Sequence, residues 1–211
     1  MELINNEVIL KGKMVEEPQY HHTAGDLNFY EMKLSVKRPS DKADVIPVLV
    51  SSELASAIME MKSKFLQITG QYRSYNWNDG KSHLLLFVFA YEVAPVESIN
   101  DDPNSVINLH GFICKKPVFR VTPNGREIVD FIFAVNRAYG KSDYIPCIAW
   151  KQNANVIKDL PVGTELWLTG HIESRDYNKK ISETEVEKRM AYEVSIASFD
   201  TSREAIVADI T

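Results

Sequence analysis

Alternating apolar and polar residues predict the same order of elements in each half of the chain. Alternation with a period of two, bounded by turn residues, is typical of strands that bury one face. In the second half the runs that predict strands are Val106–Ile113, Ile128–Val135, Tyr144–Trp150, Glu165–Arg175 and Met190–Phe199. In the first half they are Val8–Met14, Leu27–Lys37, Val45–Val50, Phe65–Tyr75 and Leu84–Val93.

A short helix is expected after the third strand of each half. In the second half Gln152–Leu160 carries apolar residues at helical spacing, Asn153 is expected to cap it, and Pro161 and Gly163 end it. The corresponding stretch of the first half is Glu53–Lys62. The polar stretch Asp176–Arg189 predicts a loop between the last two strands.

Three strands, a helix and two strands is the order of the OB fold, a five-stranded Greek-key barrel. The predicted fold class is therefore all-β with one short helix per domain, in two tandem OB-fold barrels. The exposed face of such a barrel commonly binds single-stranded nucleic acid or oligosaccharide. Fold alone does not fix function, so the side chains on that face decide what is bound.

The two halves also share residues at a fixed spacing, which indicates a duplicated domain. The residues that recur 99 positions later are Gly12, Pro18, Thr23, Arg38, Asp44, Ile46 and Pro47, matched by Gly111, Pro117, Thr122, Arg137, Asp143, Ile145 and Pro146. The spacing becomes 100 where Gly70, Ser74 and Trp77 meet Gly170, Ser174 and Tyr177. A one-residue insertion in a loop explains the change.

We expect four segments along the 211 residues. The first OB domain spans 1–97, a polar linker with two aspartates and two prolines nearby spans 98–103, the second OB domain spans 104–200, and a tail spans 201–211. Two domains of about 100 residues agree with ordinary domain sizes.

Composition narrows the expected partners. The net charge is −5 and the pI is about 5.6, so the chain lacks the basic excess common in nucleic-acid-binding proteins. Splitting the chain at residue 100 gives −3 and −2, so neither half is basic. Any surface that binds phosphate must therefore be local.

Catalytic and cofactor motifs are not found in the sequence. The five histidines are scattered without metal spacing, and neither a phosphate-binding glycine loop nor a nucleophile elbow is present. We therefore expect no enzyme activity, no cofactor and no metal. Cys114 and Cys147 lie in apolar runs and are expected to be reduced thiols of a cytoplasmic protein. The apolar runs are far shorter than the roughly 18 residues of a membrane span, and no signal peptide is predicted.

The second half carries a series of motifs in a specific order: Asn104–Gly111, Arg120–Gly125, Phe133–Arg137, Asp143–Trp150 and Gly163–Arg175, followed by Tyr177. In their order and spacing these motifs resemble those of bacterial single-stranded DNA-binding proteins of the SSB family. The first half is similar but degraded, and matches best at Val8–Gly12 and Gly70–Trp77. The resemblance implies a tandem OB-fold member of that family.

The resemblance also implies a function and a set of site residues. The function is non-catalytic, largely sequence-independent binding of single-stranded DNA in replication, recombination or repair. In the second domain, Tyr139, Tyr144, Trp150 and Tyr177 are expected to stack on bases, and Arg137, Lys141, Lys151 and Arg175 to contact phosphates. The expected contributors from the first domain are Trp77, Tyr75, Arg73 and Arg38. A homodimer with four OB folds is the expected assembly, and replication or recombination proteins are expected partners.

The first domain departs from the family pattern. Ser40, Val45 and Ser51 stand where the second domain has Tyr139, Tyr144 and Trp150, so this domain is predicted to bind weakly or only to assemble. Trp167 lies in an apolar run and is predicted to be core or interface. Two alternatives to single-stranded DNA binding stay open. One is a protein-interaction or assembly module, and the other is an RNA or primosome-type OB protein.

Overall fold

In the computed structural model, the described residues are 5–40, 42–78, 82–99, 103–180 and 186–201. The first half forms five strands and a helix, with the bounds β1 Asn6–Ala24, β2 Leu27–Lys37, β3 Ala43–Ser51, α1 Ser52–Glu60, β4 Phe65–Asn78 and β5 Ser82–Pro95. The second half repeats this order with β6 Ser105–Ile113, β7 Val118–Val121, β8 Glu127–Asn136, η1 Ala138–Gly140, β9 Ser142–Trp150, α2 Lys151–Ile157, β10 Glu165–Lys180 and β11 Val186–Asp200. Neither α1 nor α2 is long and apolar enough to cross a membrane.

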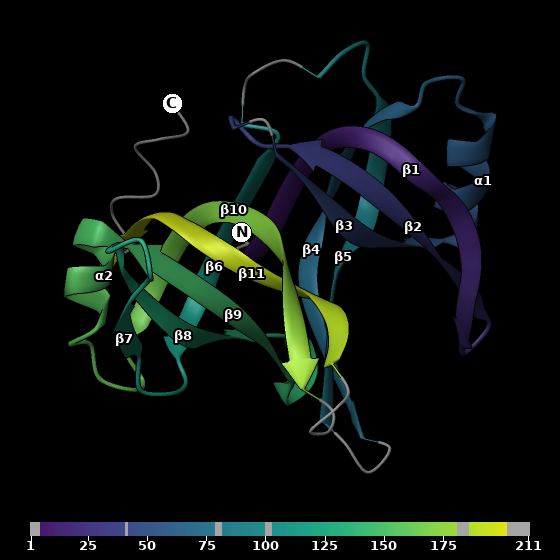
Figure 1. Cartoon of the computed structure of the whole chain (residues 1–211). Helices are drawn as coiled ribbons and strands as arrows, with labels where there is room; N and C mark the ends of the chain where they lie inside the picture. Colours follow the sequence, from purple (N-terminus) through teal and green to yellow (C-terminus); the bar gives the residue numbers. More distant parts are fainter. Residues whose placement is uncertain (1–4, 41, 79–81, 100–102, 181–185, 202–211) are drawn as a thin grey trace.

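Each half closes into a barrel (Figure 1). In the first barrel the strands pair in the order β1-β2-β3-β5-β4 and return to β1. In the second barrel the order is β6-β8-β9-β11-β10 and back to β6, with the short β7 added outside β8. The predicted fold class, two tandem OB-fold barrels with one short helix each, is confirmed.

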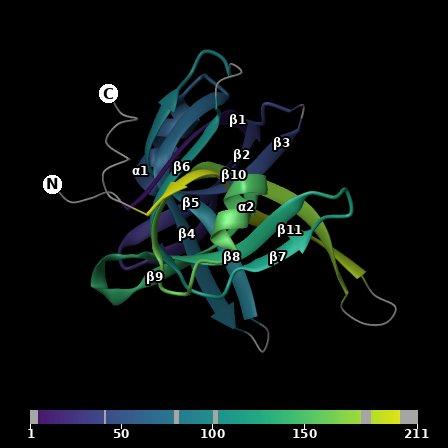
Figure 2. The same ribbon diagram turned by 90° about the vertical axis from the view of Figure 1, so that its left-hand side faces the viewer.

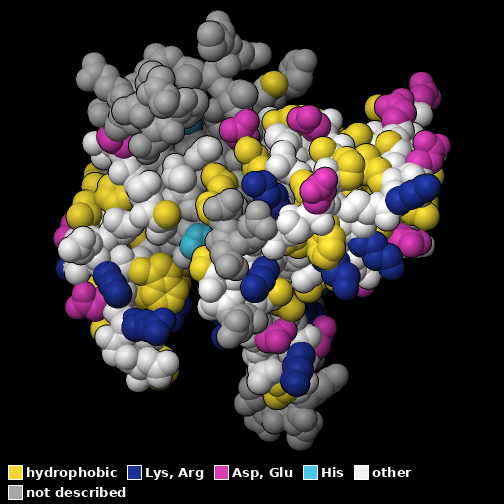
Figure 3. Space-filling model, turned by 90° about the horizontal axis from the view of Figure 1, so that it is seen from above, with side chains coloured by type: hydrophobic (Ala, Val, Ile, Leu, Met, Phe, Trp, Pro, Cys, Tyr) yellow, Lys and Arg dark blue, Asp and Glu magenta, His cyan; other side chains and the backbone are white. Residues whose placement is uncertain are grey.

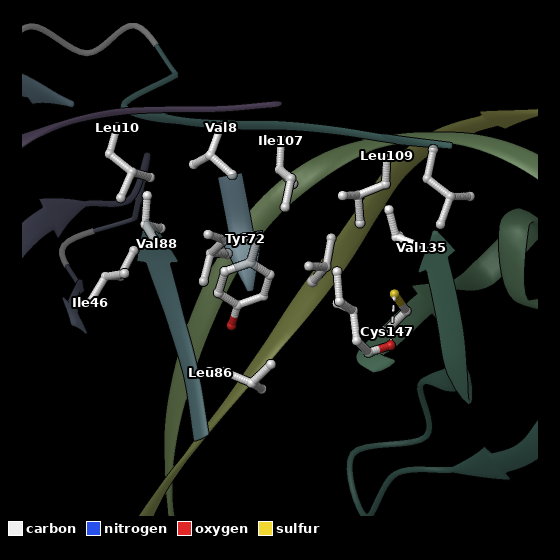
Figure 4. Close-up of a cluster of buried hydrophobic side chains, with 14 of the residues drawn as sticks. Val8, Leu10, Ile46, Tyr72, Leu86, Val88, Ile107, Leu109, Val135 and Cys147 are labelled. Atoms are coloured by element: carbon white, nitrogen blue, oxygen red, sulfur yellow. Dashed lines mark hydrogen bonds between the residues drawn. The ribbon is translucent and has the colours of Figure 1, made fainter. Parts of the chain in front are cut away.

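Strand alternation builds the core as predicted. In β6, for example, Ile107, Leu109, Gly111 and Ile113 are buried, while the residues that alternate with them are partly exposed. Figure 4 shows that the buried side chains of the two barrels meet in one continuous cluster under β1 and β6. Tyr72 lies in this cluster beside Ile107 of the other barrel, and burial raises the pKa of its hydroxyl well above the ordinary value.

The two barrels are joined by antiparallel pairing of β1 with β6, so that the described strands form one eleven-stranded sheet. The pairs Asn6–Leu109 and Leu10–Ser105 lie symmetrically about Val8–Ile107. In the repeat, Asn6 is equivalent to Ser105 and Leu10 to Leu109, so the two pairs are copies of each other. An approximate twofold axis therefore passes through the centre of this ladder. Figure 2 shows the two barrels from the side.

Two long hairpins differ from the sequence prediction. β10 continues to Lys180 and β11 begins at Val186, so the loop expected over Asp176–Arg189 is largely strand. β1 likewise continues from Met14 to Ala24, paired with β2. These extensions lie outside the barrels and are largely exposed on both faces. Backbone hydrogen bonds between the paired strands hold the extensions together. Such bonds do not require alternating apolar residues, so the sequence pattern did not predict these strands.

The second helix also differs in detail. α2 begins at Lys151, one residue before the predicted start, and no side chain caps it. The prediction that Asn153 caps this helix is wrong, because its side-chain amide donates to the Ala197 carbonyl at 3.0 Å instead. In α1, by contrast, the Ser51 hydroxyl accepts from the Leu54 amide at 3.3 Å and caps the helix.

The duplicated Gly70 and Gly170 mark the same bend in both barrels. Each lies at a register shift between the fourth and fifth strands of its barrel. A Cβ atom would lie 2.4 Å from the Phe89 carbonyl oxygen at Gly70, and 2.3 Å from that of Ser195 at Gly170. Backbone crowding therefore requires glycine at both positions.

Candidate nucleic-acid interface

A buried carboxylate from each barrel holds the other barrel in place. Asp143 of β9 is fully buried and accepts hydrogen bonds from Arg137 Nε at 2.7 Å and Arg73 Nη1 at 2.8 Å. It also accepts from the Ser74 backbone amide at 2.6 Å, and Arg137 reaches the Ser74 carbonyl at 2.8 Å. Two guanidinium groups, one from each barrel, therefore share a single carboxylate.

The twofold-related contact is built around Asp44 of β3. Arg38 donates Nε to Asp44 at 2.7 Å and Nη2 to the Ser174 carbonyl at 3.0 Å, and the Ser174 amide donates to Asp44 at 2.6 Å. The hydrogen bond to Asp44 is the main reason that the pKa of Arg38 is raised. Glu173, at 2.9 Å from Arg38, takes the place that Arg73 has at the first contact.

The pKa of the Glu173 carboxyl is lowered by these neighbours. Burial opposes ionisation, but the hydrogen bond to His171 and the charge of Arg38 outweigh it. We call the two contacts the Asp143 junction (Arg73, Ser74, Arg137, Asp143) and the Asp44 junction (Arg38, Asp44, Glu173, Ser174). They fix the relative position of the two barrels, because each links strands that are far apart in the sequence.

Three arginines that were predicted to bind phosphate therefore lie in the contacts between the two barrels. Arg38, Arg73 and Arg137 are each mostly buried in a junction and pair with a carboxylate. The sequence prediction missed this role, although Arg38, Asp44 and Ser74 were all among the duplicated residues. Phosphate binding by these arginines stays a prediction. It would use only those guanidinium N–H groups that do not already donate hydrogen bonds within the junctions.

The Asp143 junction brings predicted site residues of both barrels together. The Ser74 hydroxyl accepts from the Tyr144 amide at 2.8 Å, so the start of β9 lies against β4. The Tyr144 ring is 44% exposed, and Tyr75, next to Ser74 on β4, is 57% exposed. Two tyrosines and two arginines thus converge where the barrels meet.

The other predicted aromatics lie in different surroundings. Trp150 is half-buried and donates its indole N–H to Ser195 Oγ at 3.1 Å, which fixes the ring at the end of β9. Tyr177 is 36% exposed on β10, opposite Arg189 of β11. Trp167 is half-buried and stacks on His110, with ring centroids 4.3 Å apart. The side chains of Trp77 and Tyr139 lie outside the described part of the structure.

The predicted basic residues of the second barrel lie on its surface. Lys141 and Lys151 are exposed at the two ends of β9, and Arg175 is exposed on β10, 3.3 Å from Glu193. A groove of about 480 Å³ is lined in part by Pro146 of β9, two residues after Tyr144 and four before Trp150. Its basic lining residues are Lys115, Lys116, Arg120 and Arg175, and its acidic ones are Asp130 and Glu193.

The sequence prediction omitted Lys115, Lys116 and Arg120 from the site. The adjacent lysines directly after β6 were the available signal. Across the face seen in Figure 3, Lys and Arg side chains are interspersed with Asp and Glu, so positive charge gathers only locally. Among the described residues, no His, Cys, Asp and Glu side chains gather in a group that could hold a metal ion.

Comparison with known proteins agrees with this architecture. The single-stranded DNA-binding protein from Thermus aquaticus has a crystal structure with a TM-score of 0.72 and 20% identity, over 95% of this chain and 94% of that one. At this identity the similarity shows the fold, a tandem OB fold over nearly the whole chain. The model of the single-strand binding protein family matches residues 104–201.

The curated sequence relatives each cover a little over a third of this chain. The single-stranded DNA-binding protein of Bacillus cereus is 36% identical over 94 residues, which cover 39% of this chain and 55% of that protein. The single-stranded DNA-binding protein A of Bacillus subtilis is 33% identical over 79 residues, covering 34% and 46%. The chain spans about half the length of the curated relatives it matches. The similarity to the single-strand binding protein family model therefore lies over the second barrel.

Proposed function

We propose that the protein binds single-stranded DNA without catalysis and with little sequence preference. The observation that carries the proposal is the outer face of the second barrel. Exposed Tyr144 and half-buried Trp150 lie on β9, and Pro146, between them on that strand, lines a groove with four basic side chains. Aromatic faces beside a cationic groove are what a sequence-indifferent single-strand binder requires.

Base stacking and phosphate contacts would both contribute to the binding free energy. Each base stacked on an aromatic side chain contributes about 1–3 kcal/mol. The exposed ring of Tyr144 is available for this, and the anchored Trp150 offers a ring of fixed orientation. The basic groove would follow the phosphates, although Asp130 and Glu193 on its rim reduce its net charge. We therefore expect stacking to supply the larger share of the binding free energy.

The same proposal includes the cellular setting and the domain limits. Replication, recombination or repair in the bacterial cytoplasm are the processes in which exposed single strands need a binder. The limits 1–97 and 104–200 place a barrel in each OB domain, and 98–103 joins β5 to β6. Replication or recombination proteins would be the partners of the bound complex.

We propose further that two chains form a dimer with four barrels. The outer face of the central sheet supports this, because Ile9, Phe112 and Trp167 lie there half-buried between inward-facing residues. A twofold dimer would cover these side chains, and linked barrels would add avidity for a long strand. Sedimentation equilibrium at micromolar concentration should give twice the 24.0 kDa chain mass. A species of one chain mass would refute the dimer.

A comparison of three polymers tests the binding proposal. Tryptophan fluorescence should be quenched by oligo-dT, and duplex DNA should bind much more weakly, because its bases cannot reach the aromatic rings. Stronger binding of oligo-U than of oligo-dT would support the RNA alternative. Indifference to all three polymers would support the assembly-module alternative and overturn the proposal.

A further inference from the structure

A large apolar cleft opens on the first barrel. It measures about 920 Å³, at the upper end of the roughly 300–1,000 Å³ typical of ligand pockets. Strands β2, β3 and β5 supply most of its apolar lining, and β11 of the second barrel reaches one side. The apolar lining includes Phe29 of β2, Leu49 of β3, and Leu85, Phe87 and Phe89 of β5.

The sequence of β5 gives this cleft an apolar wall. Residues 84–90 form an unbroken apolar run in a strand that pairs antiparallel with β4. Because side chains alternate along a strand and Val88 is buried in the barrel, Phe87 and Phe89 lie on the outer face. Antiparallel strands with one solvated face ordinarily carry polar residues there. A contiguous apolar surface that is left exposed in this way is typical of a binding site.

The second barrel is an internal comparison for this wall. Counted from the register shift that both barrels share, Phe87 is equivalent to Glu193 of β11. In the same way, Phe89 is equivalent to Ser195. The outer face of the fifth strand is therefore polar in the second barrel and apolar in the first.

Charge differs between the two barrels as well. Lys115 and Lys116 line the groove of the second barrel, and the residues 99 positions earlier are Glu16 and Glu17. Both glutamates are exposed on β1. Carboxylates at these positions repel the phosphates that lysines attract. The first barrel thus lacks the cations by which the second barrel would follow a nucleic-acid backbone.

The charged groups that line the cleft are compensated within the protein. Lys33 is 2.9 Å from Glu16, and the two lining arginines belong to the Asp143 junction, where they share a buried carboxylate. Glu31 lines the cleft as a further acid. Because these charges largely cancel, the cleft is complementary to an uncharged apolar surface and not to a polyanion.

The walls of the cleft form the outer face of a sheet. The rings of Phe29 and Phe89 lie 5.9 Å apart, and Leu49 pairs with Phe89. The apolar face of a sheet is stably covered by a helix or by a second sheet. His21 of β1 and Tyr75 of β4 line opposite hairpins of the same cleft, which therefore suits one narrow element better than a sheet.

A helix meets this requirement, because it satisfies its own backbone hydrogen bonds. An amphipathic helix docks in a groove through apolar side chains at spacings i, i+3, i+4 and i+7. Neither α1 nor α2 lines the cleft, so the helices of the described structure do not fill it.

We propose that the cleft is a docking site for the apolar stripe of an amphipathic helix from a partner protein. The proposal goes beyond single-strand binding, because the second barrel would hold the strand while the first barrel holds the partner. It assigns the two barrels different classes of ligand, according to the polar and apolar outer faces of their fifth strands.

A peptide selection with two charge variants tests the proposal. Leu85→Glu puts a carboxylate in the cleft, and Leu27→Glu puts one on β2 outside the cleft lining. Leu85 is 43% and Leu27 54% exposed, so both variants should fold, which thermal unfolding checks. A displayed library of random peptides of about 16 residues, enough for about four helical turns, is selected on the full chain without use of either variant.

Selected peptides should carry apolar residues at helical spacing and gain helical circular dichroism when they bind. They should bind Leu27→Glu like the wild type and Leu85→Glu about tenfold more weakly or worse, since a buried carboxylate opposes an apolar contact. Oligo-dT affinity should be the same in all three proteins.

Three results would overturn the proposal: no selected peptide, selected peptides without helical spacing, or peptides that bind both variants equally. If Leu85→Glu loses oligo-dT affinity that Leu27→Glu retains, the cleft is a single-strand site; this proposal is then refuted while the proposed function stands. If the peptides behave as expected but the wild type binds no oligo-dT, the proposed function is refuted and the docking site stands.

Discussion

Replacing Asp143 by asparagine should destabilise the protein more than the same replacement at Asp44 or Asp130. Asp143 is fully buried and neutralises Arg73 and Arg137, whose side chains are 21% and 28% exposed. Removing one partner of a buried ion pair costs about 3–5 kcal/mol. Because water reaches both guanidinium groups, we reduce this to about 2–4 kcal/mol for Asp143→Asn.

The twofold-related Asp44→Asn change is the matched comparison. Asp44 is almost as deeply buried but pairs with one arginine, Arg38, which Glu173 also contacts. Loss of the Asp44 charge also relieves its repulsion of Glu173. Asp44→Asn should therefore cost less free energy of unfolding than Asp143→Asn. Asp130→Asn, at an exposed pair with Arg120, should cost only about 0–1 kcal/mol.

Urea unfolding followed by circular dichroism and tryptophan fluorescence measures these three free energies under identical conditions. We predict the order Asp143, then Asp44, then Asp130, from the largest loss to the smallest. An Asp143→Asn loss no larger than that of Asp130→Asn would refute the assignment of Asp143 as the carboxylate that holds the barrels together. Equal losses for the two buried aspartates would refute the charge argument alone.

Backbone crowding, a lowered carboxyl pKa and an exposed aromatic ring each give a further prediction. Gly170→Ala should lower the free energy of unfolding by at least about 1 kcal/mol in the same urea assay, because its Cβ would lie 2.3 Å from the Ser195 carbonyl; wild-type stability would contradict this. The pKa of Glu173 is lower in the folded protein than in the unfolded chain, where it is about 4.3. The ionised Glu173 carboxylate therefore stabilises the fold at pH values above the unfolded-state pKa, and this stabilisation is lost as the pH falls through the folded-state pKa. The urea midpoints of the wild type and Glu173→Gln should therefore become equal at pH values below the folded-state pKa of Glu173. A difference in midpoint that does not change with pH would contradict stabilisation by the Glu173 charge. Tyr144→Ala should weaken oligo-dT binding about tenfold in equilibrium titrations, while Tyr91→Ala, exposed on β5 outside both grooves, should leave it unchanged.

The sequence predicted the barrel strands because their inward residues alternate. Leu166 and Leu168 of β10, for instance, are buried as the period of two requires. The outer halves of β10 and β11 could not be predicted in this way, because they bury neither face. Their pairing, such as Tyr177 with Arg189, is held by the backbone of the partner strand.

The candidate site was less predictable than the fold. Arg137 was expected to contact phosphate because it lies near the aromatics, whereas its main partner is Asp143 at the inter-barrel contact. That contact forms only when the two barrels pack against each other. The alternation of residues along a strand gives no information about how two domains pack. The cleft on the first barrel was missed for a related reason. Its aromatic walls, including Phe29 and Phe89, stand at positions that the family resemblance does not mark.

The salt dependence of oligo-dT binding, followed by tryptophan fluorescence, tests the central claim most directly. Log affinity of a single strand falls with log salt by about 0.7 for each phosphate neutralised. With a net charge of −5 and a mixed groove, we predict a shallow slope from a few phosphate contacts, together with strong quenching as bases stack near Trp150. A steep slope with unchanged fluorescence would indicate a purely ionic groove and would contradict binding by stacked bases.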